Sequence, residues 1–191
     1  MDVRAAACIF LLAIAGCTEA KAPRSESRLK VTVPIGGKTG QVNGVVWPKD
    51  DEELIDTWAI EEPLDISIQF PWGAFASYSR CSFLSHMRGR ITEVEILPLE
   101  KPVTLKDAIR IAGNLADRLG TDVGSAFREC ADHWTDTTVD ADVFTTLTTR
   151  VPLRDHFEVY FEIKLHSSGS GWFIVLTIQD CQNRAELNGA G

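Results

Sequence analysis

The alternation of apolar and polar residues is clearest in the last third of the chain. Phe157, Val159, Phe161, Ile163 and Leu165 occupy every second position, with polar or amphipathic residues between them. This period of two predicts a strand with one buried and one solvated face. After the reversal HSSGSG, residues 172–179 are apolar at nearly every position. They predict a strand that is central in its sheet, or covered on both faces, rather than an edge.

Spacings of three and four predict two helices upstream of these strands. Thr104 is a good N-cap, and Asp107 three residues later completes a variant of the capping box. Apolar residues then recur on one face as far as Leu119, and Gly120 is expected to end the helix in a left-handed conformation. A second helix is predicted over 122–134, and its expected buried face is Val123, Ala126, Phe127, Cys130 and Trp134.

The first hundred residues contain shorter elements. Strands over 29–33 and 42–47 predict a hairpin through PIGGKTGQ, followed by a short helix over 52–58. The segment FPWGAF interrupts a strand over 64–70, and strands over 78–86 and 91–97 predict a second hairpin that turns at MRGR. A further strand is expected within 143–153.

The order of strands, two helices and strands indicates an α+β fold. We expect a mainly antiparallel β-sheet with two helices packed on one face. The predicted organisation is a single domain over 29–182 and a flexible tail over 183–191.

The first residues of the chain are typical of an export signal. Residues 5–15 carry no charge, but this run is shorter than the roughly 20 apolar residues that cross a bilayer. The polar stretch TEAKAPRSESR follows directly, which argues against a buried helix of a cytosolic protein. Cleavage after Ala20-Lys21-Ala22 is disfavoured because Pro23 would follow the cut.

The segment Ile14-Ala15-Gly16-Cys17 resembles the lipobox of bacterial lipoproteins, and the resemblance covers only residues 1–17. It implies that residues 1–16 are a signal peptide and that Cys17 is the lipidated first residue of the mature chain. Residues 17–28 then form a polar tether, and the membrane is a partner through the N-terminal lipid. Thr18 after the cysteine implies the outer membrane, with the domain facing the periplasm.

The formal charge of −8 argues against binding to nucleic acid or to anionic lipid surfaces, and it is compatible with a basic protein partner in the periplasm. Three cysteines follow Cys17: Cys81, Cys130 and Cys181. An oxidising periplasm favours a disulfide, for which Cys130 with Cys181 is our choice. Three separate buried thiols are the competing interpretation.

Motifs for catalysis or cofactor binding are weak. The sequence has no G-x-S-x-G or H-E-x-x-H, and GGKTG lacks the earlier glycine of a phosphate-binding loop because position 32 is threonine. Cys130 and His133 are three residues apart on a predicted helix, and we interpret them as a core thiol beside a surface histidine. We therefore predict no metal, no cofactor and no catalytic residues.

One stretch, FPWGAFASY, is a candidate binding surface because aromatic side chains on a Pro/Gly loop can anchor a protein partner. Its candidate residues are Trp72, Phe75 and Tyr78. The alternative, which we favour, is that Trp72 and Phe75 fold back onto the core.

These features predict a non-enzymatic, lipid-anchored envelope protein that binds or inhibits another protein. An immunity protein that neutralises a toxic effector or a cell-wall hydrolase would be similar in size, cellular location and charge, and the proposal rests on this analogy. The alternative is a structural or assembly lipoprotein of an outer-membrane complex. An enzyme with an unrecognised site would require His133 or His156 to lie in a pocket beside carboxylates.

Overall fold

Two β-sheets and two helices make up the computed structural model, which describes residues 28–47, 55–136, 146–166 and 169–182. The larger sheet has six strands in the order β2-β5-β6-β9-β8-β7, and each neighbouring pair is antiparallel. These strands are β2 (Ile55–Ile60), β5 (Ser82–Met87), β6 (Arg90–Ile96), β9 (Trp172–Asp180), β8 (Phe157–Leu165) and β7 (Thr146–Pro152). The smaller sheet consists of β1 (Leu29–Pro34), β3 (Leu64–Phe70) and β4 (Gly73–Ser79).

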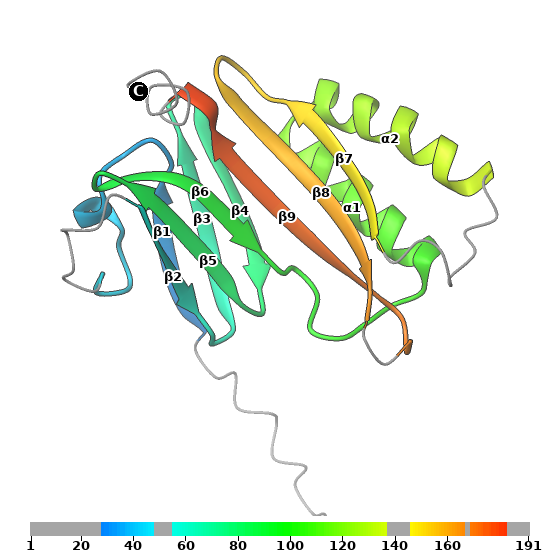
Figure 1. Cartoon of the computed structure of the whole chain (residues 1–191), viewed down its shortest axis with the longest axis horizontal. Coiled ribbons are helices and arrows are strands. Elements are labelled where there is room, and N and C mark those ends of the chain that lie inside the picture. The colour runs from blue at the N-terminus through cyan, green and yellow to red at the C-terminus, as the bar shows by residue number, and fades with distance from the viewer. Residues whose placement is uncertain (1–27, 48–54, 137–145, 167–168, 183–191) are drawn as a thin grey trace, which may run out of the picture.

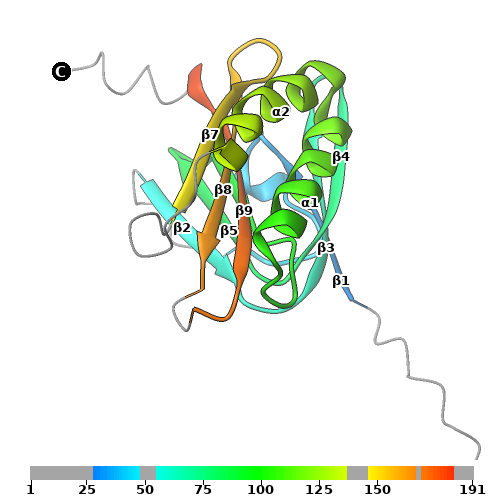
Figure 2. The same ribbon diagram turned by 90° about the vertical axis from the view of Figure 1, so that its right-hand side faces the viewer.

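The helices and the small sheet lie on the same side of the large sheet (Figure 1, Figure 2). Helices α1 (Leu105–Leu119) and α2 (Thr121–Asp136) lie behind β7, β8 and β9 in Figure 1, and the small sheet lies behind β5 and β6. The predicted α+β fold, mainly antiparallel and with both helices on one face, is confirmed. No element in the described part of the chain covers the opposite face of the large sheet, which we call the outer face.

The core lies between the large sheet and the layer behind it. The predicted alternation in β8 holds, since Phe161 and Ile163 are fully buried while Glu162 between them is not. Phe127 of α2 packs against Phe161 with ring centroids 5.0 Å apart. The ring of Trp134 also contacts Phe127, with ring centroids 5.8 Å apart. Burying an aromatic side chain of this kind stabilises a fold by about 1.5–3 kcal/mol.

Helix α1 begins as the sequence predicts. The Asp107 amide donates to the Thr104 hydroxyl at 3.2 Å, and that hydroxyl donates to the Asp107 carboxylate at 2.9 Å. Gly120 ends the helix, and its amide donates to the Ala116 carbonyl at 3.1 Å. Its backbone has φ 158° and ψ 150°, so the prediction of a left-handed conformation at Gly120 is wrong.

The predicted hairpin at the start of the domain is also wrong. β1 pairs in parallel with β3, and residues 42–47 form no strand. Only Asn43 pairs with β1, through two backbone hydrogen bonds with Thr32 at 2.9 and 3.0 Å. Gly44, with φ 98°, then lies so close to β1 that a Cβ there would be 1.9 Å from the Lys30 carbonyl oxygen. The chain therefore turns away from β1, and no further strand is added to this edge of the small sheet.

Two other predicted boundaries are corrected. The short helix over 52–58 is wrong from residue 55 onward, because those residues belong to strand β2. The predicted strand over 78–86 is two strands, since β4 ends at Ser79 and β5 begins at Ser82. Arg80 and Cys81 between them carry the chain from the small sheet to the large one. The other predicted strands and both helices are confirmed within a few residues.

Several predicted features lie outside the described residues. They are the signal peptide with Cys17, most of the tether, the tail over 183–191 and the side chain of His133. Neither helix in the described ranges is long and apolar enough to span a membrane.

Candidate functional site

The stretch FPWGAFASY is not a loop as predicted, because Phe75 and Tyr78 belong to β4 and only Pro71 and Trp72 lie between strands. Its three candidate aromatic residues do not share one surface. Phe75 is 3% exposed and points into the core. Trp72 is half-buried, because its ring stacks on Phe70 at 5.1 Å and meets Phe157 edge-on at 5.3 Å. These two residues therefore fold back onto the core, as the favoured alternative expected. Tyr78 points away from the core, and its role as a binding residue stays a prediction.

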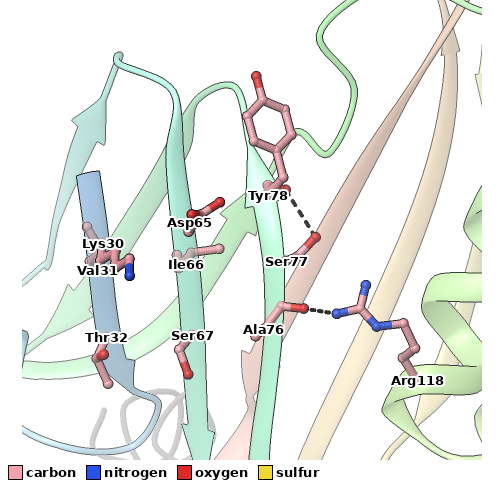
Figure 3. A pocket seen from close by; sticks show the side chains of 10 residues that line it. All are labelled: Lys30, Val31, Thr32, Asp65, Ile66, Ser67, Ala76, Ser77, Tyr78 and Arg118. Carbon is pink, nitrogen blue, oxygen red and sulfur yellow. Dashed lines mark hydrogen bonds between the residues drawn. The ribbon is translucent and has the colours of Figure 1, made fainter. Parts of the chain in front are cut away.

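A shallow groove crosses the small sheet on the side where Tyr78 lies (Figure 3). The strand register aligns Lys30, Asp65 and Tyr78 in one row across the sheet. The next row contains only the small side chains of Thr32, Ser67 and Ala76, which gives the groove its depth. At the edge of the groove, the Arg118 guanidinium of α1 donates to the Ala76 carbonyl oxygen (Figure 3).

Charged side chains occupy one end of this groove. The Arg28 guanidinium lies 4.7 Å above the centre of the Tyr78 ring and forms ion pairs with Asp65 at 3.8 Å and Glu100 at 3.5 Å. Burial, and then the charge of Glu100, raise the pKa of the Tyr78 hydroxyl. The charged side chains at this end of the groove therefore already have partners within the domain.

A polar pocket of about 380 Å³ lies where β8 begins and β9 ends. The Asp180 carboxylate in it is 1% exposed, and an Asp180 oxygen lies 3.4 Å from Nε2 of His156. Arg90 also lines the pocket and donates to the Gly36 carbonyl at 3.3 Å. This histidine–carboxylate pair is the arrangement that the enzymatic alternative requires. No hydroxyl or thiol side chain lines the pocket among the described residues, so it lacks a protein nucleophile there.

The outer face of the large sheet carries two columns of carboxylates. Glu93 and Glu95 come from β6, Glu158 and Glu162 from β8, and β9 runs between them. Strands two apart in a sheet are about 10 Å apart, so the columns face each other across a narrow strip. On β9 this strip consists of uncharged side chains, namely Val175, Thr177 and Gln179. Val175 and Thr177 are 6% and 8% exposed although no layer covers them, because the longer side chains on β6 and β8 shield them from solvent.

Cations and amides compensate three of the four carboxylates. Arg150 forms a forked contact with Glu158 at 2.5 and 2.7 Å, and this hydrogen bond lowers the pKa of Glu158. Lys164 pairs with Glu162 at 2.5 Å, and the Gln179 amide donates to Glu93 at 2.6 Å. Arg80, whose guanidinium lies 5.3 Å from the centre of the Phe173 ring at the end of β9, is a third cation on this face. With three cations against four carboxylates, the outer face retains a small excess of negative charge.

Glu95 is the exception. It has no hydrogen-bond or ion-pair partner in the described part of the chain, and burial raises its pKa. The charges of Glu93 and Glu162 raise this pKa further, while Lys164 opposes them. A partly desolvated carboxylate beside like charges gains most when a cation approaches it. Sequence analysis did not select these four glutamates, although the alternation in β8 did assign Glu158 and Glu162 to a wet face.

The predicted Cys130–Cys181 disulfide is not formed. Cys81, Cys130 and Cys181 are free thiols in the structure. The Cys181 thiol contacts Glu158 at the end of the outer face, whereas Cys130 lies on α2 behind the sheet. The sheet therefore separates the two sulfur atoms. Burial and the hydrogen bond to Glu158 raise the pKa of Cys181 to about 11, which makes it a poor nucleophile.

Within the described ranges, no three or more His, Cys, Asp or Glu side chains are grouped so that they could hold a metal ion. No protein-family model, curated protein or solved structure matches this chain.

Proposed function

We propose that this chain is a lipid-anchored envelope protein whose outer face binds a basic protein partner. The observation that carries the proposal is the uncovered six-stranded sheet with two columns of carboxylates around a dry, uncharged strip. Protein interfaces combine a desolvated centre with charged surroundings that complement the partner. Val175 and Thr177 supply such a centre, and the four glutamates supply the surroundings.

The place where β1 begins supports the assignment of the outer face as the binding surface. The described chain begins at Arg28 beside β1, and β1 lies in the layer behind the large sheet (Figure 2). A chain held to a membrane through its N-terminal end would therefore direct the outer face away from the anchor. The acidic charge of that face would also disfavour contact with an anionic lipid surface.

A basic partner fits the inhibitory role better than a scaffolding one. An inhibitor of a toxic effector or a cell-wall hydrolase must cover a defined site, and a face whose carboxylates Glu158, Glu162 and Glu93 are held by internal partners offers a preorganised surface. The structural or assembly alternative instead predicts co-purification with an integral membrane complex. Capture experiments separate the two through the identity of the bound protein.

The test uses the full-length tagged chain, expressed in its own cells and purified in detergent. We expect it to retain a soluble basic protein, and the charge-reversed variant Glu95→Lys to retain at least about tenfold less. Glu129→Lys is the matched control, because Glu129 is exposed on α2 and the change in charge is identical. Retention should also weaken as salt is increased. Equal retention by both variants, or retention of an integral membrane complex only, would contradict the proposal.

A further inference from the structure

A second charged region lies at the β5–β6 end of the large sheet, where two turns meet that are about fifty residues apart in sequence. The loop after β1 contributes Lys38, Thr39, Gly40 and Gln41, and the turn between β5 and β6 contributes Arg88, Gly89 and Arg90. Together they line a pocket of about 540 Å³, which we call the cationic pocket. Neither turn alone predicts a site, since GGKTG lacks the earlier glycine of a phosphate-binding loop and MRGR reads as a tight reversal.

Backbone hydrogen bonds hold the two turns together. The Thr39 amide donates to the Gly89 carbonyl at 2.9 Å, and Lys38 bridges to Arg90. The amides of Gly36 and Ile91 donate to the Ile91 and Gly37 carbonyls, each at 2.8 Å. Main-chain pairing therefore fixes the backbone of both turns, and a ligand would have to order only the side chains.

The lining is cationic in a chain that is acidic as a whole. Lys38, Arg88 and Arg90 are all exposed, and no carboxylate from the described ranges lines the pocket. None of these three side chains has an ion-pair partner in the part of the chain that the structure describes. The nearest buried carboxylate described, Asp180, belongs to the neighbouring pocket, where it contacts His156 and the Gln182 amide.

The backbone at Arg88 supplies an independent observation. Arg88 has φ 50° and Gly89 has φ 70°, so both central residues of this two-residue hairpin turn have positive φ. Asn, Asp and Gly are the usual residues at the first of these positions, and a longer side chain there costs about 1 kcal/mol. A strained turn residue whose side chain faces a pocket is a recurrent feature of binding sites.

We propose that the cationic pocket binds a phosphate group. Arginine forks and a lysine ammonium are the side chains that recognise phosphate oxygens, and a doubly charged phosphate neutralises more of this pocket than a carboxylate does. The pocket is larger than a phosphate ion and therefore accommodates a phosphate ester. The loop is not a nucleotide-binding P-loop, because position 32 is threonine and only a three-residue 3₁₀ turn follows.

The experiment titrates the full-length chain in detergent with inorganic phosphate and follows backbone amide signals by NMR at constant ionic strength. We expect saturable shifts of Thr39, Gly40 and Gly89 at millimolar phosphate, and no comparable shifts with acetate. Arg88→Asn should weaken binding roughly tenfold or more while keeping the fold, because asparagine suits the turn. Lys38→Gln is the second variant and should have the same effect on affinity.

Lys106→Gln is the matched control, since Lys106 is exposed on α1 and the loss of charge is the same. It should leave phosphate binding unchanged. Glucose 6-phosphate and phosphatidic acid vesicles then distinguish a soluble ester from a lipid headgroup as the source. Absence of saturable shifts, equal shifts with acetate, or unchanged affinity in Arg88→Asn and Lys38→Gln would overturn the proposal. None of these outcomes depends on a partner for the outer face.

Discussion

Glu95 is the residue at which stability and binding are expected to oppose each other. Its carboxylate lies on the outer face between the like charges of Glu93 and Glu162, and burial withdraws part of its hydration. In the free domain this charge is a cost, because its hydration is reduced and the nearest acidic groups, Glu93 on the same strand and Glu162 two strands away, repel it. A binding surface that retains such a residue is more stable once its partner is bound.

The variant Glu95→Gln tests this opposition. Because the pKa of Glu95 is raised on folding, the folded state binds the proton more tightly than the unfolded state does. Ionisation of Glu95 therefore lowers stability as the pH rises through the window between the ordinary and the raised pKa. We expect Glu95→Gln to raise the free energy of unfolding at pH 7 by a few tenths of a kcal/mol, since solvent screens a half-exposed carboxylate, and the gain to vanish at acidic pH.

Thermal unfolding measured from acidic to neutral pH checks this result, with Glu129→Gln as the control of equal charge change. The same Glu95→Gln variant should bind the partner more weakly than the original chain. If Glu95→Gln is less stable than the original chain at pH 7, its carboxylate has a stabilising partner and is not available to a ligand.

At the scale of elements, the loop between β1 and β2 depends on one glycine. Gly44 has φ 98°, and an added Cβ would lie 1.9 Å from the Lys30 carbonyl oxygen, a main-chain atom that cannot move aside independently. Gly44→Ala should therefore separate this loop from β1 and break the backbone pair between Thr32 and Asn43. We expect a loss of at least about 2 kcal/mol, from strain at positive φ and the steric conflict together.

Urea unfolding with a matched glycine measures this loss. Gly40 lies in the same region, has no heavy atom within 4 Å of an added Cβ, and does not have a positive φ. Gly40→Ala should leave both the urea midpoint and the melting temperature nearly unchanged. Gly44→Ala should lower both, and the melting temperature should fall by roughly 4–8 °C. Equal midpoints for the two variants would show that the loop relaxes without cost.

Elements with a strong local period were predictable, and elements fixed by long-range pairing were not. The capping residues at Thr104 and Asp107 specify α1, and strict alternation specifies β8, because both signals lie within one element. Nothing local shows that β1 pairs with β3 across about thirty residues, so the apolar run over 42–47 looked like the natural return strand. Acidic residues before β2 similarly suggested a helix, but pairing with β5 decides its conformation.

At the scale of the whole molecule, the same limit applies to the candidate sites. Alternation assigned Glu158 and Glu162 to a wet face, but only the strand order β6-β9-β8 brings Glu93 and Glu95 opposite them. The cationic pocket likewise needs the loop after β1 to meet the β5–β6 turn. Catalytic and ligand-binding motifs lie within short segments, whereas both proposed surfaces are assembled from strands and turns that are far apart in sequence.

The predicted lipid anchor and the proposed outer-face interaction are separable in one experiment. Cys17 lies ahead of the described residues, and the described chain begins in the layer behind the outer face. Cys17→Ala should therefore remove the anchor without altering the binding surface. Two or more acyl chains hold a protein stably to a bilayer, so their loss should transfer the chain from the membrane fraction to the soluble fraction.

Cells labelled with radioactive palmitate and then fractionated provide the measurement, with Ser25→Ala as a control substitution in the predicted tether. We expect Cys17→Ala to lose both the label and the membrane association, yet to retain the basic partner with unchanged affinity in detergent extracts. A Cys17→Ala chain that still sediments with membranes would exclude this cysteine as the anchor. Loss of the partner together with the label would show that binding requires the membrane, which contradicts an interface formed by the outer face alone.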